Sequence, residues 1–135
     1  MHGTILVVDD DPLIREAARL VLSREGYGVL MAADGQRAME LMTSHENAGT
    51  VCAVLCDLDM PKVGGKELIA HLRKHHPAIP IIVLSGAPDI VYLEGVVQDG
   101  VSDWMRKPAT RETLLQKVHT AANLYALRKQ QGAHS

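Results

Sequence analysis

Residues 53–61 read AVLCDLDMP, an apolar run that ends in the two carboxylates of Asp57 and Asp59. The run begins at VCAVLC (residues 51–56), and its apolar residues are continuous instead of alternating with polar ones. That pattern is typical of a strand covered on both faces, as the strands of parallel sheets are. Polar residues that directly follow such a strand stand at the sheet edge where α/β proteins place their chemistry. The stretch therefore predicts a parallel sheet with a functional site at one strand end.

Two cysteines, Cys52 and Cys56, lie in this strand. A rise of ~3.3 Å per residue separates them by ~13 Å, which is too far for a disulfide. Their even spacing predicts that both face the same side of the sheet. We interpret them as small core residues with reduced thiols, because the C-x-x-C spacing of redox and metal sites is absent.

Short apolar runs alternate with helical patterns along the chain. The runs are TILVV (4–8), YGVLMA (27–32), VCAVLC (51–56), IPIIVL (79–84) and VSDWM (101–105). Between the first two, Asp11 is placed to cap a helix, Pro12 to occupy its first turn and Gly26 to end it. A less regular helical pattern spans PDIVYLEGVVQDG (88–100), where apolar residues cover more than one face. We expect an α/β domain with a doubly wound, five-stranded parallel sheet in the order 2-1-3-4-5, flanked by five helices in the flavodoxin-like arrangement.

Length and charge narrow the class of protein. The chain has 135 residues, which suits one domain, expected over residues 1–131 with a disordered tail at 132–135. Its 14 basic and 16 acidic residues give a formal charge of −2, so no positive field favours direct nucleic acid binding. Apolar runs are too short for a membrane span, and we expect a cytoplasmic protein without membrane contact.

Reactive side chains follow four of the five expected strands. Asp9 and Asp10 follow the first, Asp57 the third, Ser85 the fourth and Lys107 the fifth. If the strand order is 2-1-3-4-5, the first and third strands are neighbours at the reversal of strand order, so the three aspartates converge. Their mutual repulsion, roughly 1 to 4 kcal/mol for each pair, calls for a cation. Hard oxygen ligands that remain partly open to water favour Mg²⁺.

Such a site suits phosphoryl transfer. A bound cation would cancel charge on a phosphoryl group and leave the Asp57 carboxylate free to attack phosphorus and form an acyl phosphate. Lys107 could place its point charge on a phosphoryl oxygen, and the Ser85 hydroxyl could donate a hydrogen bond to another.

Four segments together resemble the receiver (CheY-like) domain of two-component response regulators: ILVVDDDP, LCDLDMPKVGG, IIVLSG and DWMRKP. The resemblance covers nearly the whole chain, and the order and spacing of the segments make it specific. It implies that Asp57 is the phosphoacceptor. It also implies that Mg²⁺ or Mn²⁺ is held by Asp9, Asp10, Asp57 and the backbone carbonyl of Asp59.

The resemblance further implies a conformational switch. Ser85 matches the residue that senses the phosphoryl group, Trp104 the aromatic residue that swings inward, and Lys107 the conserved lysine, whose bond to Pro108 is usually cis in the family. Gly65 matches the glycine of the loop after the phosphorylation site. The implied function is Mg²⁺-dependent phosphoryl transfer to Asp57 from a sensor histidine kinase or histidine phosphotransfer protein. The protein would catalyse only its own phosphorylation and dephosphorylation, and signal through helix four, strand five and helix five.

Several questions stay open at this level. Ala109 replaces the usual Phe after Lys-Pro, Trp104 replaces the more common Tyr, and Asp59 adds a carboxylate near the phosphoryl position. The effect of these departures on phosphoryl lifetime and switching is not predictable. The sequence does not identify the output or the cognate kinase. It also leaves open a homodimer through the surface of helix four, strand five and helix five, and whether the receiver is a stand-alone protein or part of a longer regulator.

Other classes fit less well. The DLD triplet resembles the nucleophile motif of haloacid-dehalogenase-like phosphatases, but those enzymes carry it on the first strand. A flavodoxin-like nucleotide binder would place a Gly- or Ser/Thr-rich loop after the first strand, where DDDP would repel phosphate. His71 and His75 are spaced to chelate zinc on a helix, but no third ligand accompanies them, and we expect both to be solvated.

Overall fold

The computed structural model describes residues 3–60, 64–86 and 100–133. Its strands are β1 (Thr4–Val8), β2 (Gly28–Ala32), β3 (Val51–Asp57), β4 (Ile81–Ser85) and β5 (Asp103–Arg106). Every neighbouring pair is parallel, and the order across the sheet is β2-β1-β3-β4-β5. The predicted doubly wound sheet and its strand order are confirmed.

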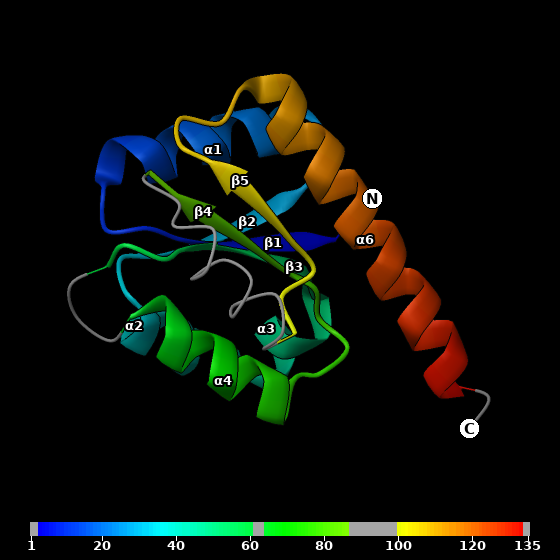
Figure 1. Cartoon of the computed structure of the whole chain (residues 1–135). Helices are drawn as coiled ribbons and strands as arrows, with labels where there is room; N and C mark the ends of the chain where they lie inside the picture. The colour runs from blue at the N-terminus through cyan, green and yellow to red at the C-terminus, as the bar shows by residue number, and fades with distance from the viewer. Residues whose placement is uncertain (1–2, 61–63, 87–99, 134–135) are drawn as a thin grey trace.

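Helices cover both faces of the sheet (Figure 1). α1 (Pro12–Arg24) and α6 (Arg111–Ala133) lie on one face, and α2 (Gly35–Met42) and α4 (Gly65–His75) lie on the other. The short α3 (His45–Thr50) packs beside α2 and was not predicted from the sequence. No helix in the described ranges is long and apolar enough to cross a membrane.

The helix ends follow local sequence signals. Asp11 caps α1 as predicted, because its carboxylate accepts a hydrogen bond from the N–H of Leu13 at 2.9 Å. Gly26 follows the helix with a φ of 91°, a left-handed conformation that glycine adopts without steric cost. At the other end of the chain, α6 continues through Gly132 and Ala133, which the sequence analysis placed in a disordered tail. The helix expected over residues 88–100 lies almost wholly outside the described residues.

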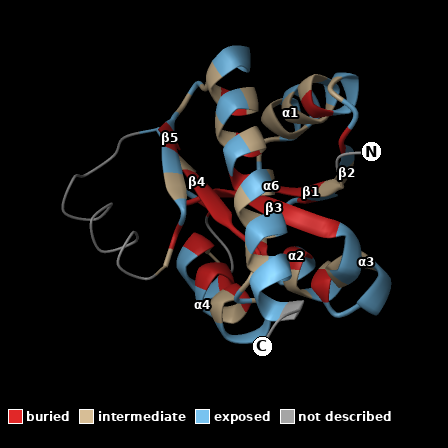
Figure 2. Cartoon of the chain, turned by 90° about the vertical axis from the view of Figure 1, so that its right-hand side faces the viewer, coloured by how far each residue is buried: buried red, intermediate tan, exposed pale blue. Residues whose placement is uncertain are grey.

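Alternate residues of the strands feed two apolar cores, one on each face of the sheet. The core beneath α1 and α6 includes Ile5, Val7, Ala53, Leu55 and Ile82 of the strands, with Leu22, Leu114, Val118 and Ala121 of the helices. The core beneath α2 and α4 includes Leu6, Val8, Val54, Ile81 and Val83, with Ala38, Met42, Leu68, Ile69 and Leu72. All of β3 is buried between these layers (Figure 2), which explains its continuous apolar sequence.

The cysteines differ from the sequence expectation in one respect. Neither forms a disulfide within the described part of the chain, and both are buried, as expected of core residues. However, Cys52 packs in the core beneath α1 and α6, whereas Cys56 packs in the core beneath α2 and α4, so the prediction that they share a face is wrong. The register of the β1 and β3 pairing changes between Thr4 and Ile5, because Thr4 pairs with Val51 but Ile5 pairs with Ala53. The extra residue is Cys52, and it breaks the strict alternation on which the prediction relied.

Candidate functional site

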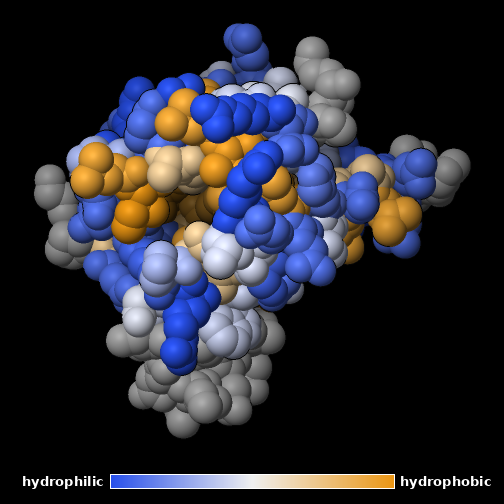
Figure 3. Space-filling model, turned by 90° about the horizontal axis from the view of Figure 1, so that it is seen from above, coloured by the Kyte–Doolittle hydropathy of each residue, from blue (hydrophilic) through white to orange (hydrophobic). Residues whose placement is uncertain are grey.

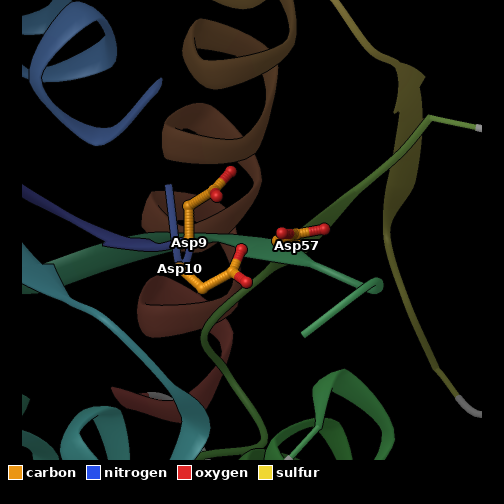
Figure 4. Close-up of side chains that lie close together, drawn as sticks. All are labelled: Asp9, Asp10 and Asp57. Carbon is orange, nitrogen blue, oxygen red and sulfur yellow. The ribbon is translucent and has the colours of Figure 1, made fainter. Parts of the chain in front are cut away.

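The three predicted acidic residues meet at the carboxyl edge of β1 and β3. These strands are neighbours, and Val8 pairs with Cys56, so the residues that follow in each strand emerge side by side. Asp9, Asp10 and Asp57 each offer one carboxylate oxygen, and these oxygens all lie within 4.8 Å of one another. Figure 4 shows the three side chains gathered at this edge of the sheet. The convergence predicted from strand order is therefore present.

The Asp57 carboxylate is held through one oxygen only. Its Oδ1 accepts a hydrogen bond from the Asp59 N–H at 2.9 Å and lies 2.9 Å from the Lys107 ammonium. Its Oδ2 is buried and has no hydrogen-bond partner among the described residues. A buried, unpartnered carboxylate oxygen is costly unless a ligand completes its coordination. The side chain is thus positioned on one oxygen and available on the other.

Lys107 reaches the cluster because β5 ends beside β4. The Lys107 N–H donates to the Ser85 carbonyl at 2.9 Å, which continues the β4 and β5 pairing past the last strand residue. The ammonium then lies 2.9 Å from Asp57 and 3.7 Å from Asp9 Oδ2. The peptide bond between Lys107 and Pro108 is cis, as the resemblance implied.

Electrostatics in the cluster disfavour a full set of negative charges. Burial raises the pKa of Asp9 from 3.8 to about 6, with a further upward contribution from the Asp57 charge, against the lowering effects of the Asp11 N–H and Lys107. Burial acts to lower the pKa of Lys107, but its hydrogen bond to Asp57 and the charges of Asp57 and Asp9 outweigh it, so that this pKa is raised. Lys107 therefore stays charged, yet it cannot neutralise three carboxylates alone.

The chemistry of this cluster fits a divalent cation. Two of the carboxylates, Asp9 and Asp57, are 3% and 1% exposed, whereas Asp10 is exposed, so the site is anchored in the protein and open to solvent on one side. Mg²⁺ favours this arrangement, since it binds through a few carboxylates and keeps several waters. The orphaned Asp57 Oδ2 is the observation that supports the fit.

The other predicted residues surround the cluster at differing distances. Ser85 is buried at the end of β4, one residue beyond the Leu84 that pairs with Asp57. Gly65 begins α4 directly behind Asp57, where an added Cβ would lie 3.0 Å from the Asp57 carbonyl. Trp104 lies in β5 and is 39% exposed, so in this structure it is not packed inward.

Two contacts of the site were not predicted. The Asp59 side chain, which the sequence analysis noted only as an added charge, accepts a hydrogen bond from the Gly86 N–H at 3.1 Å and so ties the loop after β3 to the end of β4. Arg15 of α1 donates to the Asp9 carbonyl at 2.7 Å. Arg15 lies in α1, six residues after Asp9 in the chain, and no sequence motif indicates a hydrogen bond between the two.

The histidine pair does not form a metal site in the described part of the chain. The ring centroids of His71 and His75 lie 4.5 Å apart. Among the described residues, however, the acidic cluster is the sole group of three side chains placed to bind one metal ion.

Comparison with known proteins agrees with this geometry. A sequence model described as the response regulator receiver domain matches residues 5–119. The response regulator MprA of Mycolicibacterium vanbaalenii is 36% identical over 118 residues, which are 87% of this chain and 49% of that protein. The CAI-1 autoinducer sensor kinase/phosphatase CqsS of Vibrio cholerae is 38% identical over 117 residues, 84% of this chain and 16% of that protein.

Among solved structures, a response regulator receiver domain protein from Clostridium thermocellum is similar with a TM-score of 0.81 and 28% identity, covering 96% of this chain and 98% of that one. The chain spans 49% of the length of the MprA regulator cited above. The family match extends from β1 into α6 and includes all the strand ends that carry the site. The chain therefore belongs to the family of receiver domains of two-component response regulators.

Proposed function

We propose that this receiver, over residues 1–131, accepts a phosphoryl group on Asp57 from a phosphohistidine of a sensor histidine kinase or a histidine phosphotransfer protein. The observation that carries the proposal is the Asp57 carboxylate, which is buried and fixed through Oδ1 while Oδ2 has no partner in the described part of the chain. A nucleophile needs this combination, because its position must be set without occupying the atom that reacts.

The proposed transfer is an in-line displacement at phosphorus. Asp57 Oδ2 forms the new P–O bond as the P–N bond to the donor imidazole breaks, and the imidazole nitrogen keeps the electron pair. The product is an acyl phosphate on Asp57, which water later hydrolyses to inorganic phosphate and the free carboxylate. Lys107 stays within reach of the reacting group, where its ammonium can pair with a phosphoryl oxygen.

Asp9, Asp10, Asp57 and the backbone carbonyl of Asp59 would hold Mg²⁺ or Mn²⁺ in this account. The ion would neutralise charge on the carboxylates and on the incoming phosphoryl oxygens. The remaining contributions belong to the chain itself. The Asp59 N–H orients Asp57, and the hydroxyl of Ser85 is the proposed hydrogen-bond donor to a phosphoryl oxygen.

Phosphorylation is proposed to act as a switch. New contacts of the phosphoryl group with Ser85 and Lys107 would favour one arrangement of the β4 and β5 ends, and each ~1.4 kcal/mol of differential contact shifts a two-state ratio tenfold. Trp104 is the proposed aromatic reporter of this shift because it is partly exposed and so has room to move inward. The output surface would comprise the helix expected over residues 88–100, β5 and α6, and the same surface would carry any homodimer.

Intact mass spectrometry after incubation with acetyl phosphate tests the proposal. With Mg²⁺ we expect the wild type to gain one phosphoryl group and to lose it slowly, and we expect no gain in EDTA. Asp57→Asn should gain none, whereas Asp11→Asn, which alters a neighbouring acid that only caps α1, should behave as the wild type. Equal phosphorylation of Asp57→Asn and the wild type would refute the assignment, and rapid turnover of added phosphoesters would instead favour a phosphatase.

A further inference from the structure

The side chain of Arg15 in α1 contacts the backbone of the acidic pair. Its Nη1 donates a hydrogen bond of 2.7 Å to the carbonyl of Asp9, which belongs to the peptide unit that joins Asp9 to Asp10. Because a peptide unit is planar, a hydrogen bond to its oxygen also orients its N–H and the Cα of the next residue. The Arg15 guanidinium therefore helps to set the position of Asp10, although none of the ion pairs formed by the described residues includes Arg15.

Asp9 and Asp10 are held in different ways. Asp9 is 3% exposed, its N–H donates to the Ala32 carbonyl at 3.1 Å, and its Oδ1 accepts from the Asp11 N–H at 2.9 Å. Asp10 is exposed, and within the described part of the chain no hydrogen bond or ion pair holds its carboxylate. Figure 4 shows the two side chains leaving the chain in different directions. The Asp10 carboxylate therefore depends on its backbone for its place in the cluster.

Stabilisation of α1 does not explain the contact between Arg15 and Asp9. The helix start is already held by the Asp11 cap and by the hydrogen bond from the Arg15 N–H to the Asp11 carbonyl at 3.0 Å. Arg15 is the fourth residue of α1, and the helix dipole disfavours a positive charge this close to the N-terminus. The contact thus has an electrostatic cost to the helix, and its benefit lies in the backbone of the acidic pair.

The apolar packing of α1 does not explain the contact either. The helix contributes Ile14, Ala18 and Val21 to an apolar hollow between α1 and the segment that leads into α6. Figure 3, which looks down on this side of the molecule, shows hydrophobic residues around the hollow. Arg15 is absent from the lining of the hollow, and its side chain is only half-exposed. Among the described residues, the sole hydrogen bond of this side chain is the one to Asp9.

We propose that Arg15 is a positioning residue for the divalent cation, because it fixes the peptide unit between Asp9 and Asp10 and so directs the Asp10 carboxylate. The inference rests on the metal site of the proposed function. Removal of a group that orients a metal ligand typically weakens metal binding by ~10- to 100-fold. Charge alone would act in the opposite direction, since a guanidinium repels a cation and its removal would strengthen metal binding. The sign of the change in affinity therefore separates positioning from electrostatics.

Titration of the metal-free full chain with Mn²⁺, followed by the electron paramagnetic resonance signal of the free ion, tests the proposal. Arg15→Met has an unbranched side chain without charge or donor, and it should weaken Mn²⁺ binding at least ~10-fold relative to the wild type. Arg19→Met is the same change one turn later, at an arginine paired with Glu16, and should leave binding within ~2-fold. Urea unfolding in EDTA shows whether each variant is folded. If Arg15→Met does not fold, Arg15→Gln, which has a shorter, uncharged side chain, should weaken binding in the same way.

The Asp10→Ala background identifies the residue through which Arg15 acts. If Arg15 directs the Asp10 carboxylate, Arg15→Met should change the Mn²⁺ affinity by less than ~2-fold once that carboxylate is absent. A loss of the same size in both backgrounds, or Mn²⁺ binding in Arg15→Met as tight as in the wild type or tighter, would overturn the proposal.

The same experiment separates this inference from the proposed function. A wild type that binds no Mn²⁺ would overturn both the metal site and the role of Arg15. A wild type that binds Mn²⁺ and is phosphorylated on Asp57, with undiminished Mn²⁺ binding in folded Arg15→Met, would overturn the role of Arg15 alone.

Discussion

Replacing Asp9 with asparagine is expected to stabilise the metal-free protein at neutral pH. Asp9 is 3% exposed, and its pKa is raised from 3.8 to about 6, mainly by burial. The ionised form is therefore less favourable in the folded state than in the unfolded chain. Asparagine cannot ionise, and its amide oxygen can still accept the hydrogen bond that Asp9 Oδ1 accepts from the Asp11 N–H at 2.9 Å.

The magnitude follows from the pKa shift. At ~1.4 kcal/mol per pKa unit, the rise in the Asp9 pKa corresponds to roughly 3 kcal/mol at neutral pH. Since the amide is an imperfect substitute for a protonated carboxyl, we expect Asp9→Asn to raise the free energy of unfolding by about 1 to 3 kcal/mol at pH 7. Because the folded pKa lies above the unfolded one, protonation favours the folded state. The wild type thus gains stability as the pH falls from about 6 to about 4, and the advantage of the variant disappears over the same interval.

Urea unfolding followed by circular dichroism in EDTA, at pH 7 and pH 4.5, measures both effects. Added Mg²⁺ should make the wild type the more stable of the two proteins. At a Mg²⁺ concentration 100-fold above its Kd, the wild type gains ~2.7 kcal/mol in free energy of unfolding, whereas Asp9→Asn has lost a proposed ligand. Asp11→Asn is the matched control, since it removes a charge from the same acidic run outside the cluster. A metal-free Asp9→Asn protein that is less stable than the wild type at pH 7, or an advantage that is as large at pH 4.5 as at pH 7, would refute the electrostatic reasoning.

Three further predictions concern the surroundings of Asp57. Lys107→Met should slow phosphorylation by acetyl phosphate at least ~10-fold, because it removes the cation nearest the reacting carboxylate, and intact mass against time measures the rate. Asp59→Asn should speed the same reaction by ~3- to 10-fold, because it removes a negative charge near the incoming phosphate and keeps an acceptor for the Gly86 N–H. Gly65→Ala should lower the free energy of unfolding by about 1 to 3 kcal/mol in urea titrations, because its Cβ would crowd the backbone of Asp57.

Two of these predictions, those for Lys107 and Gly65, have a matched control. Lys117→Met removes a lysine whose ion pair with Asp103 lies away from the acidic cluster, so phosphorylation should be unaffected. Gly49→Ala adds a methyl group where no atom lies within 4 Å, so no loss of stability is expected. Equal effects in variant and control would contradict the local explanations, as would slower phosphorylation of Asp59→Asn.

Much of the site was predictable because parallel strands share one carboxyl edge. Once the apolar runs were ordered 2-1-3-4-5, Asp9 and Asp57 had to emerge from neighbouring strands, and Lys107 had to approach from the strand beyond Ser85. These positions follow from the strand order, which the alternation of apolar runs and helical patterns suggested and the structure confirms.

The remaining features depend on local backbone geometry that no periodicity reveals. The extra residue at Cys52 arises from the pairing of β1 with β3, and strict alternation cannot anticipate it. The hydrogen bond from Gly86 to Asp59 joins two loops that are 27 residues apart, and it requires both loop conformations at once. Ala109 was recognisable as a missing ring, but only the packing of α1 against the start of α6 shows that neighbouring side chains leave an apolar hollow there.

The most direct test of the central claim is the location of Mn²⁺ by anomalous scattering in crystals of the wild-type protein. The account predicts one ion in contact with the Asp57 carboxylate and the acidic pair Asp9 and Asp10, adjacent to the Asp59 carbonyl. An ion bound elsewhere would contradict it. So would an empty cluster in the crystals together with phosphorylation of Asp57 in the presence of EDTA.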